Sequence, residues 1–177
     1  YSIAELGDVD GDGKRDFAIG AVHGSDLSGS VHVYKGGSGG KLLLGFTSLI
    51  DEFCAANDGP EDAEFVSVLK AYKDEWLALS MKIGESAMKN PDEAGAAAVD
   101  YMMYSGYVCL AYFWARMAVL ARHKIAEADG DVSFYEAKVM TARFYFDRLL
   151  PRTLSHKNMI LSGAGNLMQM PVERFAL

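Results

Sequence analysis

The sequence has few cysteines and lacks the closely spaced pairs that hold metals or disulfide frameworks. Only Cys54 and Cys109 occur among 177 residues, and no CxxC pair is present. Disulfide scaffolds and zinc sites place their cysteines at short, regular spacings. Because both cysteines stand in apolar, helix-prone surroundings, we expect two buried free thiols rather than a disulfide or a reactive site.

An excess of basic charge is also missing. Lys and Arg number 17 against 24 Asp and Glu, which gives a formal net charge of −7. Domains that bind nucleic acid usually carry a basic stripe or patch, so nucleic acid is not an expected partner. Half of the residues are apolar, which is typical of a globular chain and not of a disordered one.

No apolar run reaches the roughly 20 residues that a membrane span requires. The most apolar stretch, YMMYSGYVCLAYFWARMAVLA at residues 101–121, contains Arg116 and several tyrosines. It therefore predicts a buried helix and no membrane span. The chain begins at Tyr1 without a methionine or a signal peptide, so we expect it to be part of a longer protein.

Side-chain combinations that carry out catalysis are absent from the sequence pattern. No Ser-His-Asp or Cys-His arrangement has a supportive spacing, and the ExxH repeats of di-iron bundles do not occur. His123 and His156 are expected at the surface or at helix ends and not as ligands. The pairs Asp51–Glu52 and Asp74–Glu75 are expected to face solvent. No catalytic or cofactor-binding residue is predicted.

Composition changes near residue 40 and divides the chain into two predicted domains, 1–40 and 41–177. The first is rich in Gly, Asp and Ser and contains the β-prone runs FAIGAV and SVHVYK. GGSGG, which ends it, is either a natural turn or an engineered linker. The second has helical periodicity. We therefore predict a mainly α protein, a four-helix up-down bundle with a small N-terminal β segment that carries a calcium loop.

Turn and capping signals set the predicted ends of the four helices. The first three cover residues 41–57, 60–89 and 90–128, and the fourth follows ADGD. Capping boxes are expected at Asn90 with Glu93 and at Ser133 with Glu136, and Asp129 and Asp131 are expected to cap as well. Pro151 should kink or end the fourth helix, with further helix to about Ser162.

An acidic loop within GDVDGDGKRDFAIGA, residues 7–21, has the spacing of a calcium site. Calcium takes six to eight oxygen ligands, and Gly11 and Gly13 permit the tight coil that brings them together. Position 12 is Ile19 and not the glutamate of an EF-hand, which argues against that motif. The predicted ligands are the carboxylates of Asp8, Asp10, Asp12 and Asp16 and the backbone carbonyl of Lys14.

This loop, followed by GSVHVYKG, resembles the FG-GAP repeat of integrin-type β-propellers over residues 2–36. The resemblance implies a loop that joins two blade strands and binds calcium, in a setting outside the cell. A propeller needs several blades, and this chain has room for one. The alternative is a solvated acidic turn without metal.

The helical part resembles a different family. YMMYSGYVCLAYFWARMAVLA, FYEAKVMTARFYFDRLLPRT and SGAGNLMQM are similar to the C-terminal helical extension of acyl-CoA dehydrogenase flavoenzymes, from about Leu42 onward. The resemblance implies a non-catalytic assembly domain that packs on a flavin-binding body inside the cell. FAD and acyl-CoA desaturation are then expected only in the full-length parent. The two locations conflict, which favours a heterologous or engineered join.

The third predicted helix is apolar on nearly all sides, so part of its surface must be covered by a partner. We expect the dehydrogenase body or a second copy there, most simply a homodimer. Met103 and Tyr107 are the predicted interface residues, and Tyr112 and Val119 the predicted core residues. The alternative is a recognition module that binds the N-terminal β segment, tethered by GGSGG, as a peptide ligand. A groove for acyl-CoA between the helices is a third hypothesis.

Overall fold

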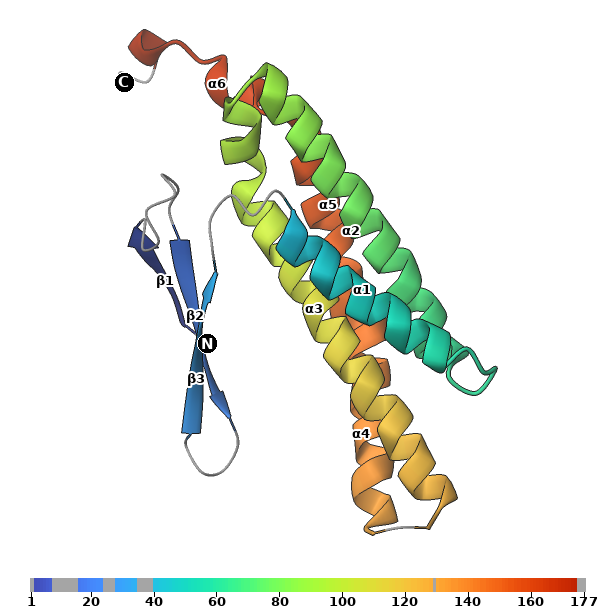
Figure 1. The fold of residues 1–177 in the computed structure, drawn as a ribbon. Coiled ribbons are helices and arrows are strands. Elements are labelled where there is room, and N and C mark those ends of the chain that lie inside the picture. Colours follow the sequence, from blue (N-terminus) through green and yellow to red (C-terminus); the bar gives the residue numbers. More distant parts are fainter. Residues whose placement is uncertain (1, 8–15, 24–27, 35–39, 129, 175–177) are drawn as a thin grey trace. The chain divides into compact units, whose positions relative to one another are not determined.

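The computed structural model describes residues 2–7, 16–23, 28–34, 40–128 and 130–174 (Figure 1). The chain divides into two compact units, Tyr1–Ser48 and Leu49–Leu177. The change of composition near residue 40 falls inside the first unit, between its strands and helix α1 (Lys41–Ala56).

The N-terminal unit contains a three-stranded antiparallel sheet in the order β1-β2-β3. Its strands are β1 (Ser2–Gly7), β2 (Asp16–His23) and β3 (Ser28–Tyr34). Ile19 pairs with Ile3 on one side and with His32 on the other. Of the predicted calcium ligands, Asp16 opens β2, whereas Asp8, Asp10, Asp12 and Lys14 lie outside the described residues. The calcium loop and the FG-GAP-like blade therefore stay predictions.

The helical unit is built around α3. Its helices are the end of α1, α2 (Ala63–Lys89), α3 (Asp92–Ala126), α4 (Val132–Phe144), α5 (Thr153–Ser162) and α6 (Gly165–Met168), with a short 3-10 turn at Val172–Arg174. Helix α3 packs against α2, α4 and α5; α2, α3 and α4 alternate in direction, and α5 continues the direction of α4 (Figure 1). The mainly helical fold is as predicted. In the described part of the chain, no helix is both long and apolar enough to cross a membrane.

Pro151 does not end the fourth helical segment. A π-helical turn (Tyr145–Leu149) and a 3-10 turn (Leu150–Arg152) join α4 to α5, so the backbone stays helical throughout. The N–H of Leu150 donates to the carbonyl of Tyr145, five residues earlier. A proline ring clashes with the carbonyl four residues before it, and a widened turn just before the ring relieves that clash.

The predicted caps are only partly correct. Asp131 caps α4, and its Oδ1 accepts a hydrogen bond from the N–H of Phe134 at 3.2 Å. Because Asp131 takes the cap position, Ser133 lies inside the helix and the predicted box with Glu136 is wrong. Asp129 lies outside the described residues.

At the start of α3, Glu93 does not close a capping box. Asn90 Oδ1 accepts from the N–H of Asp92 at 3.2 Å, but the N–H of Asn90 donates to Ser86. Glu93 Oε2 instead accepts from the N–H of Ala164 at 3.1 Å. Gly163, at φ 70°, ends α5 in the left-handed region that favours glycine. Glu93 thereby ties the start of α3 to the end of α5.

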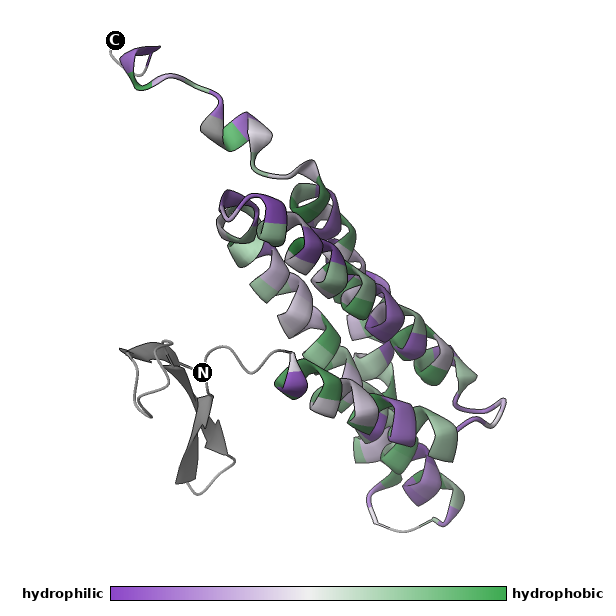
Figure 2. Cartoon of the chain, turned by 45° about the horizontal axis from the view of Figure 1, so that its top comes forward, coloured by the Kyte–Doolittle hydropathy of each residue, from purple (hydrophilic) through white to green (hydrophobic). Residues whose placement is uncertain are grey.

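The core lies between α3 and its neighbours. The largest fully buried side chains are those of Tyr104, Phe65, Ile50, Leu69, Leu150, Val108 and Thr153. Hydrophobic residues are not confined to the interior, and green segments recur around the helices in Figure 2. The distribution of these outward-facing apolar side chains decides where the unit can meet a partner.

Candidate protein-interaction surface

One face of α3 carries large apolar side chains that the other helices of the helical unit leave exposed. Residues three, four or seven apart lie on one side of a helix. The set consists of Val99, Met102, Met103, Leu110, Phe113, Met117 and Leu120, each 36–66% exposed. We call these seven residues the α3 stripe. The opposite face of α3 is buried at Tyr104, Val108, Ala111 and Ala115, so α3 has two apolar faces.

The α3 stripe is long and has charges at its two ends. Val99 and Leu120 are 21 residues apart in the sequence, which corresponds to about 32 Å along a helix. A contiguous apolar surface of a few hundred Å² on a monomer usually marks an interaction site. The first turn of α3 is acidic, with Asp92 and Glu93, and its last turn is basic, with His123 and Lys124.

A groove of about 440 Å³ borders the C-terminal half of the stripe. Its wall on α1 includes Phe53, whose ring meets Tyr112 edge-on with 5.8 Å between centroids. The guanidinium of Arg116 lies over the Tyr112 ring at 5.4 Å. The groove is lined by Phe53, Asn57, Phe113, Arg116, Met117, Val119, Leu120 and His123. This apolar floor with a basic rim suits an apolar side chain from a partner.

The burial of four α3 residues can be compared with the interface and core positions predicted for them. Met103 is exposed and belongs to the stripe, and Tyr112 and Val119 are buried, as predicted. Tyr107 is half-buried, and its carbonyl accepts a hydrogen bond from the hydroxyl of Tyr145 at 2.8 Å. Its ring stacks on His156 at 5.8 Å. The prediction for Tyr107 is therefore wrong, because this residue joins α3 to its neighbouring helices.

His156 is likewise an internal contact and not a surface residue. Its Nδ1 lies 2.9 Å from Asp100 Oδ1, and both side chains are about four-fifths buried. The pair fixes α5 on α3. His123, in contrast, is exposed in the last turn of α3, as expected.

A buried lysine binds two carboxylates, Asp51 and Asp74, whose side chains are 52% and 59% exposed and so face solvent as expected. Lys73 Nζ lies 2.6 Å from Asp51 and 2.7 Å from Asp74, and its side chain is 7% exposed. Burial by itself would lower the pKa of Lys73, but the hydrogen bonds to the two carboxylates outweigh it, and the pKa is raised. Lys73 therefore stays charged and holds α1 to α2, which is a structural role and not that of a general base.

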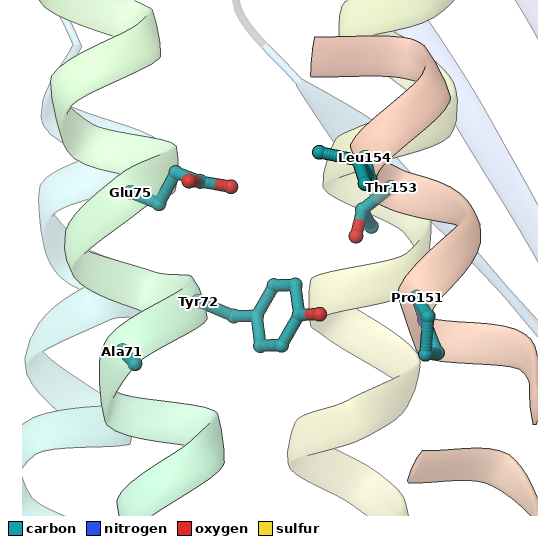
Figure 3. A pocket seen from close by; sticks show the side chains of 6 residues that line it. All are labelled: Ala71, Tyr72, Glu75, Pro151, Thr153 and Leu154. Atoms are coloured by element: carbon teal, nitrogen blue, oxygen red, sulfur yellow. The ribbon is translucent and has the colours of Figure 1, made fainter. Parts of the chain in front are cut away.

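A third carboxylate, Glu75, borders a cavity of about 250 Å³ between α2 and the start of α5 (Figure 3). Figure 3 shows Tyr72 and Glu75 on one side and Thr153 and Leu154 on the other. Glu75 accepts hydrogen bonds from the hydroxyl of Tyr104, at 2.7 Å, and from the ammonium of Lys157. Burial, with this hydrogen bond adding to it, raises the pKa of Tyr104. Glu75 is thus engaged in helix packing.

The start of α2 is held by an ionic network. The carboxylate of Asp62, whose side chain is 4% exposed, lies 3.1 Å from the guanidinium of Arg122 on α3. Arg122 also donates to the carbonyl of Glu61 and pairs with Glu64. Arg143 on α4 binds Glu64 through two hydrogen bonds of 3.0 and 2.9 Å. These contacts fix the N-terminal end of α2 to two other helices.

Both cysteines are free, as predicted, but only one of them is fully buried. Cys54 is buried and Cys109 is half-buried. Burial raises the pKa of the Cys109 thiol to about 11, and burial followed by the charge of Asp51 raises that of Cys54. Both thiols are therefore protonated at neutral pH and poorly nucleophilic.

No metal centre is present in the part of the chain that the structure describes, because no three His, Cys, Asp or Glu residues gather there with the geometry to hold an ion. The loop proposed to bind calcium lies largely outside those residues. Several charged groups of the helical unit, among them Lys73, Arg122 and His156, instead pair with carboxylates outside their own helix. The α3 stripe is a surface feature that calls for a partner.

These features define a helical-bundle domain with an open apolar face on its central helix. Residues 46–171 match the family described as acetyl-CoA dehydrogenase C-terminal like. The match covers more than half of the chain, which belongs to this family. It begins inside α1 and ends beyond α6, in agreement with the resemblance of the sequence from about Leu42 onward.

Proposed function

We propose that the helical unit is a non-catalytic assembly domain of an acyl-CoA dehydrogenase-like, FAD-dependent enzyme. The α3 stripe carries this proposal, since seven exposed apolar side chains on one helix face are a surface for protein contact. Family membership supports the link to the dehydrogenase. Lys73, Glu75 and His156 each pair with another side chain of the helical unit, which supports a role other than catalysis. FAD and the acyl-CoA chemistry then belong to the dehydrogenase body of the full-length protein.

A charge placed on the stripe tests this function. Phe113→Asp should reduce both the binding of an apolar fluorescent dye and the association of the chain several-fold, because it puts a carboxylate in the middle of the apolar face. Met140→Asp is the matched control, since Met140 is also exposed but lies on α4. Circular dichroism should show unchanged helix content in both variants, because both positions are at the surface.

Equal effects of Phe113→Asp and Met140→Asp would contradict an assembly role of the stripe. A stripe that binds dye only after residues 1–40 are removed would support the recognition-module alternative. There the N-terminal β segment, tethered by GGSGG, occupies the bundle at an effective concentration in the millimolar range.

We also propose that the loop at residues 8–16 binds calcium. Without a bidentate glutamate the dissociation constant should be about 10⁻⁴ to 10⁻³ M, as in extracellular modules. Asp10→Ala should weaken binding at least tenfold in isothermal titration calorimetry. Asp26→Ala, outside the ligand spacing, should leave it unchanged. Absence of a binding heat at millimolar calcium in the parent chain would show that the loop is a metal-free turn.

A further inference from the structure

We infer that the α3 stripe pairs with the α3 stripe of a second copy of this chain, antiparallel, about a two-fold axis near Leu110. The inference rests on the proposed function, in which the stripe is an assembly surface, and it specifies the occupant. A two-fold interface brings the same patch of both copies together, so the patch must be complementary to itself. Three features of α3 meet this condition.

The first feature is the spacing of the stripe around Leu110. Val99, Met102 and Met103 lie 11, 8 and 7 residues before it. Leu120 and Met117 lie 10 and 7 residues after it. A two-fold axis at Leu110 therefore sets Val99 against Leu120 of the other copy and Met103 against Met117. Apolar side chains meet apolar side chains along the whole length.

The second feature is a match between side chains and hollows. Gly106 lies four residues before Leu110, and a Cβ placed on it would have no atom within 4 Å. Phe113 lies three residues after Leu110 and is exposed. In the antiparallel pair, Phe113 of each copy reaches the hollow at Gly106 of the other. Met102 likewise comes opposite Met117, at the mouth of the 440 Å³ groove.

The third feature is charge, which selects the antiparallel orientation. Asp92 and Glu93 make the first turn of α3 acidic, and His123 and Lys124 make its last turn basic. Antiparallel pairing about Leu110 places Asp92 of each α3 about 6 Å along the helix axis from Lys124 of the other and sets the two helix dipoles in opposition, whereas Glu93 is already held by Ala164 within its own copy. Parallel pairing would put like charges side by side. The charge pattern and the spacing thus favour the same arrangement.

Disulfide trapping in the full 177-residue chain tests this arrangement. In a Cys54→Ala/Cys109→Ala background, Leu110→Cys should give a cross-linked dimer on mild oxidation, because the axis brings the two introduced thiols together. Val99→Cys is the control, since its two copies would lie about 33 Å apart along the helices. A disulfide requires Cα atoms about 4.4–6.8 Å apart, so this variant should stay monomeric on a non-reducing gel.

An off-axis pair tests the register. Met103→Cys with Met117→Cys should cross-link two copies, whereas each single substitution should not. Within one copy these positions are about 21 Å apart, which excludes an internal bridge. Gly106→Leu should fill the hollow and raise the dissociation constant of the dimer at least tenfold by analytical ultracentrifugation. Gly84→Leu on α2, where a Cβ also has no atom within 4 Å, is the matched control.

Cross-linking of Val99→Cys or of Met103→Cys alone, at the level of Leu110→Cys, would overturn the antiparallel arrangement. If Leu110→Cys yields no dimer while Phe113→Asp still lowers dye binding, the second copy is the wrong occupant and the assembly surface stands. If Leu110→Cys yields no dimer and Phe113→Asp behaves like Met140→Asp, the inference and the proposed function both fail.

Discussion

Replacing Arg122 with alanine should lower the free energy of unfolding of the helical unit by about 3–5 kcal/mol. The reason is the carboxylate of Asp62, which is almost fully buried and 3.1 Å from the guanidinium. Without Arg122, the Asp62 carboxylate is still buried away from water. The positive charge that offsets the free-energy cost of this burial is then missing. The carbonyl of Glu61 and the ring of Phe65, which the guanidinium covers at 5.0 Å, lose a partner too. Chemical denaturation followed by circular dichroism measures the loss.

Two further variants separate this explanation from a general effect of surface charge. Arg143→Ala removes a bidentate pair with Glu64, but Arg143 is 52% exposed, so the cost should stay below about 1 kcal/mol. Adding Asp62→Asn to Arg122→Ala should recover part of the lost stability, because the uncompensated charge is then gone. If Arg122→Ala costs no more than Arg143→Ala, the buried carboxylate does not control stability at this end of α2.

The helices and the core of α3 could be predicted because their signals are local. Periodic apolar residues and the Asn90–Pro91 and Asp131 caps lie within a few residues of the structure that they set. Tyr112 and Val119 follow from the same periodicity, and both are buried. The surplus of apolar surface on α3 was also visible in the sequence, since its apolar residues exceed what one buried face can hold.

The polar contacts that fix the helices to one another could not be predicted in this way. Asp51 and Lys73 are 22 residues apart in the sequence, Asp100 and His156 are 56 apart, and Glu93 and Ala164 are 71 apart. Capping rules consider only the next three residues, so they assigned Glu93 to Asn90 and not to its tertiary partner. For the same reason, the sequence predicted that Asp51 and Asp74 face solvent but not that both pair with Lys73.

The two faces of α3 can be distinguished by one pair of adjacent substitutions. Val119 is 4% exposed and Leu120 is 57% exposed, because adjacent helical residues point about 100° apart. Val119→Asp should cost more than about 4 kcal/mol, since it places an unpaired carboxylate in the core. Leu120→Asp should change stability by no more than about 0.5 kcal/mol while weakening association through the stripe. Thermal unfolding and sedimentation measure the two effects.

The pH dependence of Val119→Asp provides an independent check on the cause. Burial disfavours the charged form, so the carboxyl introduced at position 119 should have a folded-state pKa above its unfolded value of about 3.9. Relative to the parent chain, the variant should then be most stable below about pH 4 and lose stability as the pH rises through the folded-state pKa. Leu120→Asp should show no such loss, because its carboxyl stays in water. A destabilisation of Val119→Asp that is the same at pH 4 and pH 7 would point to lost packing volume, and not to a buried charge, as the cause.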